Sequence, residues 1–226
     1  MTRRTNARLA GSMFLLYIAT GITQMVLFNQ ATRGSEETAA TLASIAQHAS
    51  LVEVTVLLAL LQAVYAMVLG VTLYALTRDQ DHDLALLAMS FRVGEGVINA
   101  VSIARTLALL SIATVPIGAA TRDPAAANAL GALLLRMGSL GTIAAFCFAV
   151  ASTLFSYLFL RARSIPVVLA WLGLLASLLW VVGLPLQLTG FLSGSVTYIL
   201  WIPMAVFEVA FALWLIIKGV AAPATR

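Results

Sequence analysis

The sequence contains little charge. Only 10% of its 226 residues are Asp, Glu, Lys or Arg, whereas a soluble domain of ordinary composition carries about 25%. Polar surface is too scarce to cover a water-soluble globule, so a soluble enzyme domain is excluded. Hydrophobic residues make up 62% of the chain and the mean hydropathy is +1.01. These values indicate a protein whose solvent is largely lipid.

Cysteine and lysine are also scarce. Cys147 is the single cysteine and lies in an apolar stretch, so no internal disulfide can form, and we interpret it as a buried structural thiol. The net charge of +4 comes from 12 Arg and one Lys. These residues lie at segment ends or inside segments and do not cluster on one face, so no nucleic-acid partner is expected.

Motifs for catalysis and cofactor binding are lacking. The Asp-x-Asp-x-Asp run that starts at Asp79 resembles the start of a calcium loop, but Leu84 stands where that loop needs glycine. His48 and His82 fall on opposite sides of the predicted membrane and cannot share a metal. No Ser or Cys has a nearby His, and there is no phosphate-binding glycine loop. The sequence therefore gives no catalytic residue, metal or cofactor.

Long apolar segments are what the sequence does contain. Each of six can cross a hydrocarbon core about 30 Å thick as a helix that rises about 1.5 Å per residue. Only helices satisfy the backbone within one segment in lipid, and the alternating pattern of a barrel is missing. We predict an all-α fold, a polytopic membrane bundle of six transmembrane helices in a single integral membrane domain. The predicted spans are approximately 9–28, 51–76, 84–112, 129–160, 165–190 and 196–217.

The basic residues predict the orientation of the bundle. If the N-terminus is cytoplasmic, eight Arg and Lys residues lie inside and two lie outside, the bias expected of cytoplasmic loops. Six spans return the C-terminus to the cytoplasm. We expect an N-in/C-in, multi-pass protein of the inner (cytoplasmic) membrane, with the lipid bilayer as its partner. The eight are Arg3, Arg4, Arg8, Arg78, Arg161, Arg163, Lys218 and Arg226, and the two are Arg33 and Arg122.

Two connections carry helix signals. The loop 29–50 should hold a short surface helix that begins near Ser35 and breaks near His48. A single helix from Ser35 to Leu76 would be about 60 Å long, about twice the thickness of the membrane. Asp123-Pro124 is typical of a helix cap followed by a first-turn proline. The fourth helix should therefore begin in water before it enters lipid.

Ionisable residues inside the spans are costly, at about 2.5–3.5 kcal/mol each at the bilayer centre. They are expected to face the bundle interior and to pair. Counting from Leu84, Arg92 lies about 12 Å deep and Glu95 about 16 Å deep, and Glu208 reaches a comparable depth. Six such residues occur, three acidic and three basic: Glu53, Arg92, Glu95, Arg105, Arg136 and Glu208.

A polar stripe follows one face of the third span. Its members recur at spacings of three and four residues, which places them on one side of a helix. The candidate buried polar cluster is therefore Arg92, Glu95, Asn99 and Glu208, either as a structural clamp between the third and sixth helices or as a functional polar site. The stripe consists of Arg92, Glu95, Asn99, Ser102 and Thr106.

A second candidate cluster, Glu53, Arg105 and Arg136, falls towards the outer leaflet. The positions of these three charged residues are explained adequately by side chains that extend to the lipid headgroups. The second span has a mild polar face that should turn towards the third span. That face consists of Thr55, Gln62, Tyr65 and Thr72.

Small residues recur every fourth position in the third and fourth spans. Such stripes let helices approach closely, although chance runs are an alternative in an alanine-rich chain. We predict that these two helices pack along the stripes, with the third helix central and mostly shielded from lipid. The stripes are Gly96, Ala100, Ala104 and Ala108, and Gly141, Ala145, Ala149 and Thr153.

Three stretches carry a resemblance to a known family. They are Ala7-Arg8-Leu9-Ala10-Gly11 at the entry to the first span, LALLAMSFRVGEGV from Leu84, and SIPVVLAWLGLLASLLWVVG from Ser164. With the order of the spans, they resemble a bacterial membrane family catalogued as domain-of-unknown-function family 4386. The resemblance implies a compact multi-span helical bundle. It supplies no substrate, cofactor or catalytic residue.

Three classes of function remain open. The favoured one is an integral membrane protein with a charge-paired interior that binds or translocates a small molecule or ion. The second is an intramembrane enzyme that acts on a lipid or isoprenoid, with Glu95 and Glu208 as acid and base and Arg92 tuning one of them. The third is an accessory or scaffold protein that works through its helix faces. A lipid or another small molecule is the expected ligand.

Overall fold

The computed structural model describes residues 2–33, 37–114, 123–192 and 195–221, with the backbone alone for 195–198. Within these ranges the secondary structure is helical, and six helical stretches are long and apolar enough to cross a membrane. They are α1, α3, α4, α5 together with α6, α7, and α8. The predicted all-α, multi-span class is confirmed. The helices are α1 (Arg3–Ala31), α2 (Thr38–Gln47), α3 (Ala49–Thr77), α4 (His82–Thr114), α5 (Pro124–Arg136), α6 (Ser139–Ala162), α7 (Val167–Leu188) and α8 (Ser195–Ile217).

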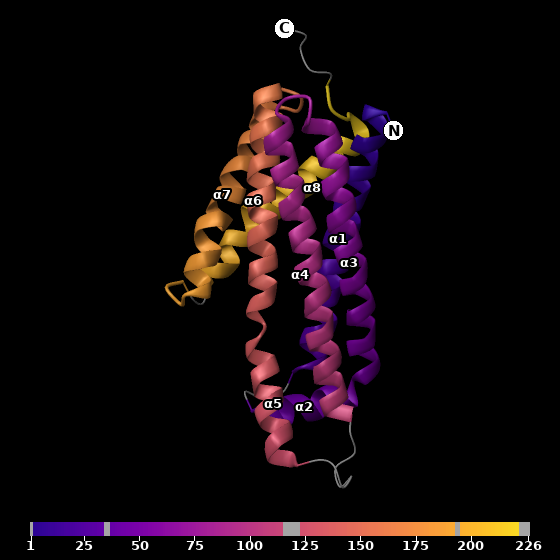
Figure 1. Cartoon of the computed structure of the whole chain (residues 1–226), viewed down its shortest axis with the longest axis vertical. Helices are drawn as coiled ribbons and strands as arrows, with labels where there is room; N and C mark the ends of the chain where they lie inside the picture. Colours follow the sequence, from indigo (N-terminus) through magenta and orange to yellow (C-terminus); the bar gives the residue numbers. More distant parts are fainter. Residues whose placement is uncertain (1, 34–36, 115–122, 193–194, 222–226) are drawn as a thin grey trace.

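The six spans form a closed ring. Each packs against the next one in the chain, in the order α1, α3, α4, α6, α7 and α8, and α8 returns to pack against α1. The start of α1 and the end of α8 therefore lie at the same end of the bundle (Figure 1). There the Ala221 N–H donates to the Ser164 carbonyl at 2.9 Å and ties the end of α8 to the α6–α7 connection.

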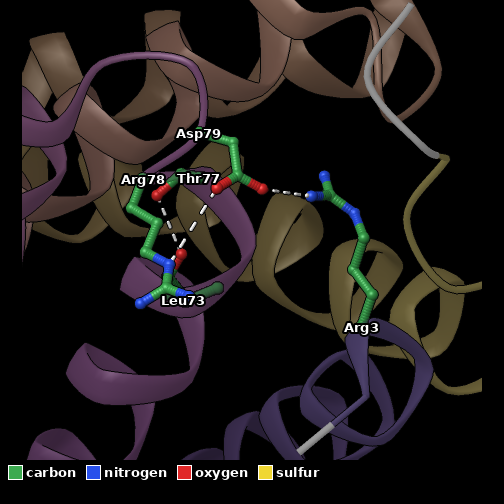
Figure 2. A network of polar contacts seen from close by, with 5 residues as sticks. All are labelled: Arg3, Leu73, Thr77, Arg78 and Asp79. Atoms are coloured by element: carbon green, nitrogen blue, oxygen red, sulfur yellow. Dashed lines mark hydrogen bonds and ion pairs between the residues drawn. The ribbon is translucent and has the colours of Figure 1, made fainter.

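Figure 2 shows how α1 is tied to the α3–α4 turn at this end. A guanidinium nitrogen of Arg3 lies 3.3 Å from the Asp79 carboxylate, which also lies 4.0 Å from Nε of Arg78. The Thr77 hydroxyl donates to the Leu73 carbonyl in the last turn of α3. These ion pairs are partly exposed, so each contributes only about 0–1 kcal/mol.

The same turn also receives an arginine from α6. Nη1 of Arg161 lies 3.3 Å from the Asp81 carboxylate. Basic residues from α1, α3 and α6 thus gather at one end of the ring, which is the arrangement that the predicted orientation requires. Arg122 and Arg226, which that prediction also uses, lie outside the described residues.

Two short helices cover the opposite end. α2 packs against α4 and α5 there, and the break between α2 and α3 falls at His48, as predicted. The Asp123 carboxylate accepts a hydrogen bond from the Ala125 N–H at 2.9 Å, and Pro124 opens α5, so the predicted cap is confirmed. The fourth span is not the single helix expected over 129–160, because it breaks between Arg136 and Ser139.

The break lies at a glycine that is close to an arginine of α4. Gly138 lies at the break, and a Cβ on it would lie 3.3 Å from Nη1 of Arg105. Glycine also costs about 1 kcal/mol more than alanine inside a helix. A glycine at the break therefore leaves room for an arginine of α4 to approach the junction of α5 and α6.

α4 packs against α6, as predicted, but half of the predicted stripe residues do not face this contact. Gly96 faces α3, where a Cβ would lie 3.0 Å from the Ala63 carbonyl oxygen. Ala100 and Ala104 are exposed, and a Cβ on Gly141 would meet nothing within 4 Å. This part of the prediction is wrong, since the spacing of small residues does not say which neighbouring helix they face.

α4 packs against four other helices of the described residues, α2, α3, α5 and α6. Gly70 of α3 brings it close, because a Cβ there would lie 3.0 Å from Cβ of Arg92. One face of α4 is nevertheless exposed at Val93, Val97 and Val101. α3 has as many packing partners among the described helices, so the prediction that α4 is central and mostly shielded from lipid is not confirmed.

Two apolar clusters fill the ring at different heights. The larger lies in the half near the start of α1 and is rich in phenylalanine. The smaller lies at the end of the ring where α2 and α5 are, and it includes Leu42 and Ile45 of α2 and Leu109 of α4. Polar side chains occupy the ring between them. The buried phenylalanines of the larger cluster are Phe14, Phe148, Phe155, Phe159, Phe207 and Phe211.

Candidate functional site

Arg92 and Glu95 form an ion pair deep inside the ring. Nη1 of Arg92 lies 2.7 Å from Oε2 of Glu95, and each side chain is 1% exposed. Both residues belong to α4, one helical turn apart, so their side chains meet on the same face. Neither of these two atoms makes an aligned hydrogen bond, so the contact is mainly ionic.

Aromatic side chains from α1 and α6 complete the surroundings of this pair. The Tyr17 hydroxyl donates to Oε1 of Glu95 at 2.6 Å. The guanidinium carbon of Arg92 lies 5.5 Å from the Tyr17 ring centre, 5.9 Å from that of Phe14 and 5.0 Å from that of Phe148. Aromatic faces at such distances attract a cation. The Arg92–Glu95–Tyr17 cluster therefore joins α1, α4 and α6.

Glu208 of α8 lies close to this cluster but is not paired with it. Its carboxyl group lies within electrostatic range of Arg92 and Glu95, yet within the described ranges no ion pair under 4.0 Å includes it, and its Oε1 is buried without a hydrogen-bond partner. The predicted clamp between the third and sixth helices is therefore wrong in its partners. Arg92 and Glu95 lie one turn apart on α4, so their side chains meet without a contact between two helices. Arg92 therefore pairs with this neighbouring carboxylate and not with Glu208.

Sequence reasoning missed Tyr17. It is a lone tyrosine in the first span, and the available signal was its place on one helical face with Gln24, seven residues further on. The phenol supplies both a hydrogen bond to the carboxylate and a ring for the guanidinium, so it contacts both charges.

The Tyr17→Phe variant should lose the hydrogen bond and keep the ring contact. We expect the free energy of unfolding to fall by about 1–2 kcal/mol, the scale of a polar contact between membrane helices. Titration with sodium dodecyl sulfate in mixed micelles, followed by tryptophan fluorescence, measures it. A Tyr157→Phe variant, whose ring is 42% exposed, is the matched control and should change little. A loss in Tyr17→Phe no larger than in the control would contradict the assigned hydrogen bond.

A polar cavity of about 450 Å³ lies between the two apolar clusters. Along α3, for example, Val52 belongs to the smaller cluster, Thr55 and Gln62 line the cavity, and Leu69 belongs to the larger cluster. The polar lining comes from α1, α3, α4, α6 and α7. It consists of Gln24, Asn29, Thr55, Gln62, Asn99, Ser102, Arg105, Thr106, Thr142 and Gln187.

The cavity lies beside the α7–α8 connection. Leu184, Gln187 and Trp201, at the ends of these two helices, form part of its wall. α7 and α8 have 22 and 23 residues, whereas α3 and α4 have 29 and 33, so the α7–α8 hairpin ends well before its neighbours do (Figure 1). α1 and α6 flank the cavity below this hairpin and are not an extensively packed pair in the described residues. From these helix lengths and contacts we infer that the cavity opens towards the side of the bundle.

The structure distributes the predicted site residues over three environments. Asn99 and Arg105 line the polar cavity. Arg92 lines a much smaller cavity of about 10 Å³ with Ser152 and Ser156, which is room for about one water molecule. Glu95 is buried in its ion pair.

The outer-leaflet cluster is not assembled. Glu53 and Arg136 are exposed, Arg105 is half-buried, and no ion pair joins these three in the part of the chain that the structure describes. Their positions agree with side chains that reach towards the membrane surface. Arg105 differs from the other two because it faces the cavity.

The ring of apolar helices around a polar cavity places the chain in the class of multi-span helical membrane proteins. More particularly, the chain belongs to the family described as Domain of unknown function (DUF4386), whose family model matches residues 9–219. No curated protein and no solved structure gives a significant match.

Proposed function

We propose that this protein binds an amphiphilic small molecule in the polar cavity between the two apolar clusters. It would lie in the inner membrane with both chain ends in the cytoplasm, as the gathering of basic residues at that end supports. The cavity would then face the outer leaflet. The observation that carries the proposal is a volume of about 450 Å³ lined by ten polar side chains inside a ring of apolar helices.

The size and lining of the cavity support ligand binding. Small-molecule sites occupy about 300–1,000 Å³ and combine apolar walls with a few polar groups. Polar side chains inside a membrane span are costly and usually mark a functional path or site. The side opening below the α7–α8 hairpin gives a molecule dissolved in the bilayer a route to these groups.

The two rival functions have less support. Proton or ion translocation through Glu95 and Glu208 needs a polar path that includes these carboxylates, and neither residue lines the cavity. Acid catalysis by the same carboxylates needs a substrate next to them, yet Glu95 is 1% exposed and is held by Arg92 and Tyr17. The Arg92–Glu95–Tyr17 cluster is better explained as a structural contact that holds α1, α4 and α6 together at one end of the cavity.

A cysteine scan of the cavity tests the proposal. In a Cys147→Ala background, Ser102→Cys places a thiol in the cavity and Ser177→Cys places one at a position that is 0% exposed. The neutral, water-soluble reagent hydroxyethyl methanethiosulfonate should label the first about 100-fold faster, because the second must wait for local opening. Intact mass spectrometry of the purified protein in a non-ionic detergent measures both rates. Equal, slow labelling of the two thiols would mean that the cavity is closed to ligands, and the proposal would fail.

A further inference from the structure

The polar cavity has an unbalanced charge. Arg105 is the one charged residue among those that line it, and no carboxylate accompanies it. Within the described residues Arg105 takes part in no ion pair and no hydrogen bond, and its Nε is buried without a partner. A cation in a low-dielectric surrounding without a counter-charge is unfavourable, so these surroundings favour the binding of an anion.

The other polar side chains of the cavity also favour an anion. The hydroxyls of Thr55, Ser102 and Thr106 donate to backbone carbonyls of their own helices. Their protons are therefore already used, and the donors that remain in the cavity include the Arg105 guanidinium and side-chain amides. Five amide side chains line the cavity, from Gln24, Asn29, Gln62, Asn99 and Gln187.

We infer that the cavity binds the oxyanion group of an amphiphile, a carboxylate or a phosphate, with Arg105 as the residue that recognises its charge. This rests on the proposed function and names the class of ligand. A guanidinium presents paired N–H donors that match two oxygens of a carboxylate or phosphate. The side opening leaves room for an apolar tail to extend into the bilayer while the head lies beside α4.

Charged labelling reagents test the inference independently of cavity access. Ser102 is three residues from Arg105 on α4, so a thiol there senses the guanidinium. Ser102→Cys is labelled with two reagents, the anionic sulfonatoethyl and the cationic trimethylammonioethyl methanethiosulfonate. The labelling rate of each reagent is divided by the rate at which the same reagent reacts with free 2-mercaptoethanol. We expect the anionic reagent to be favoured about tenfold at low salt, a value set by one unit charge acting with opposite sign on the two reagents.

Three variants assign this preference to Arg105. Arg105→Gln should bring the ratio of the two normalised rates to about one, and Arg105→Lys should retain a preference because it keeps the charge. Arg136→Gln is the matched control, since it removes a positive charge from an exposed position outside the cavity. It should leave the ratio within about twofold of the parent, because exposed charges are screened by salt.

Protection experiments separate a lipid headgroup from a soluble anion. Labelling of Ser102→Cys by the neutral reagent is repeated with inorganic phosphate, with a phosphatidic acid, and with the diacylglycerol of the same chains. Protection by phosphate supports a soluble oxyanion, and protection by phosphatidic acid alone supports a lipid headgroup. In both cases Arg105→Gln should abolish protection. Equal protection by the diacylglycerol, or a charge ratio that Arg105→Gln leaves unchanged, would overturn the inference. Fast neutral labelling would still uphold the cavity itself.

Discussion

Replacing Glu95 by glutamine is expected to destabilise the protein by about 3–5 kcal/mol, because it leaves a buried arginine without its counter-charge. Glutamine preserves the shape of the side chain and an oxygen that accepts from the Tyr17 hydroxyl. The loss therefore reports the charge and not the hydrogen bond or the packing. Titration with sodium dodecyl sulfate in mixed micelles, followed by tryptophan fluorescence, gives the free energy of unfolding.

The double variant Arg92→Met, Glu95→Gln separates pairing from burial. Removing both charges of the pair leaves no buried arginine without a counter-charge, so the double variant should be more stable than Glu95→Gln alone, as is common when apolar residues replace a buried ion pair. Glu53→Gln, an exposed carboxylate of α3, serves as the control and should change stability by less than about 0.5 kcal/mol. A Glu95→Gln loss as small as that of the control would refute the buried pair as a constraint on the fold.

The second large effect is expected where the ring closes. α8 returns to α1 at Gly11, where a Cβ would lie 2.6 Å from the Ala212 carbonyl oxygen and 2.7 Å from Cγ1 of Ile216. A backbone oxygen in a helix cannot move aside, so Gly11→Ala forces the two helices apart. We expect a loss of about 1–3 kcal/mol, the usual cost of overpacking, measured by the same titration.

Gly94→Ala is the matched control for this prediction. Gly94 also lies inside a helix, but a Cβ there would meet nothing within 4 Å. Alanine should therefore stabilise the protein by about 0.5–1 kcal/mol through its better helix propensity. Stabilisation by both substitutions would show that α1 and α8 do not approach closely at Gly11.

Much of the architecture could be predicted from local sequence. Each span satisfies its own backbone hydrogen bonds, so an apolar stretch of sufficient length defines a helix without reference to the rest of the chain. The cap at Asp123 and the break at His48 are local in the same way. The α5–α6 break was missed because the residues 129–160 were read as one apolar segment that continues through Gly138.

The polar stripe of the third span was informative for part of the site. Spacing alone placed Arg92, Glu95, Asn99 and Ser102 on one face, and that face lines the ring interior in the structure. The partners from other helices could not be found in this way. Tyr17, Gln24 and Gln187 come from α1 and α7, and no periodicity within α4 points to them.

The sequence by itself determined the helical class, the number of long apolar stretches and the residues of α4 that turn inward, because these follow from hydropathy and from spacing along a single helix. Only the tertiary structure decided which charges pair, which helices approach each other closely at a glycine and where a cavity remains. Those features depend on the rotation of each helix about its axis and on its distance from its neighbours. Both are set by side chains that meet across the ring, such as Tyr17 with Glu95 and Gly11 with Ala212.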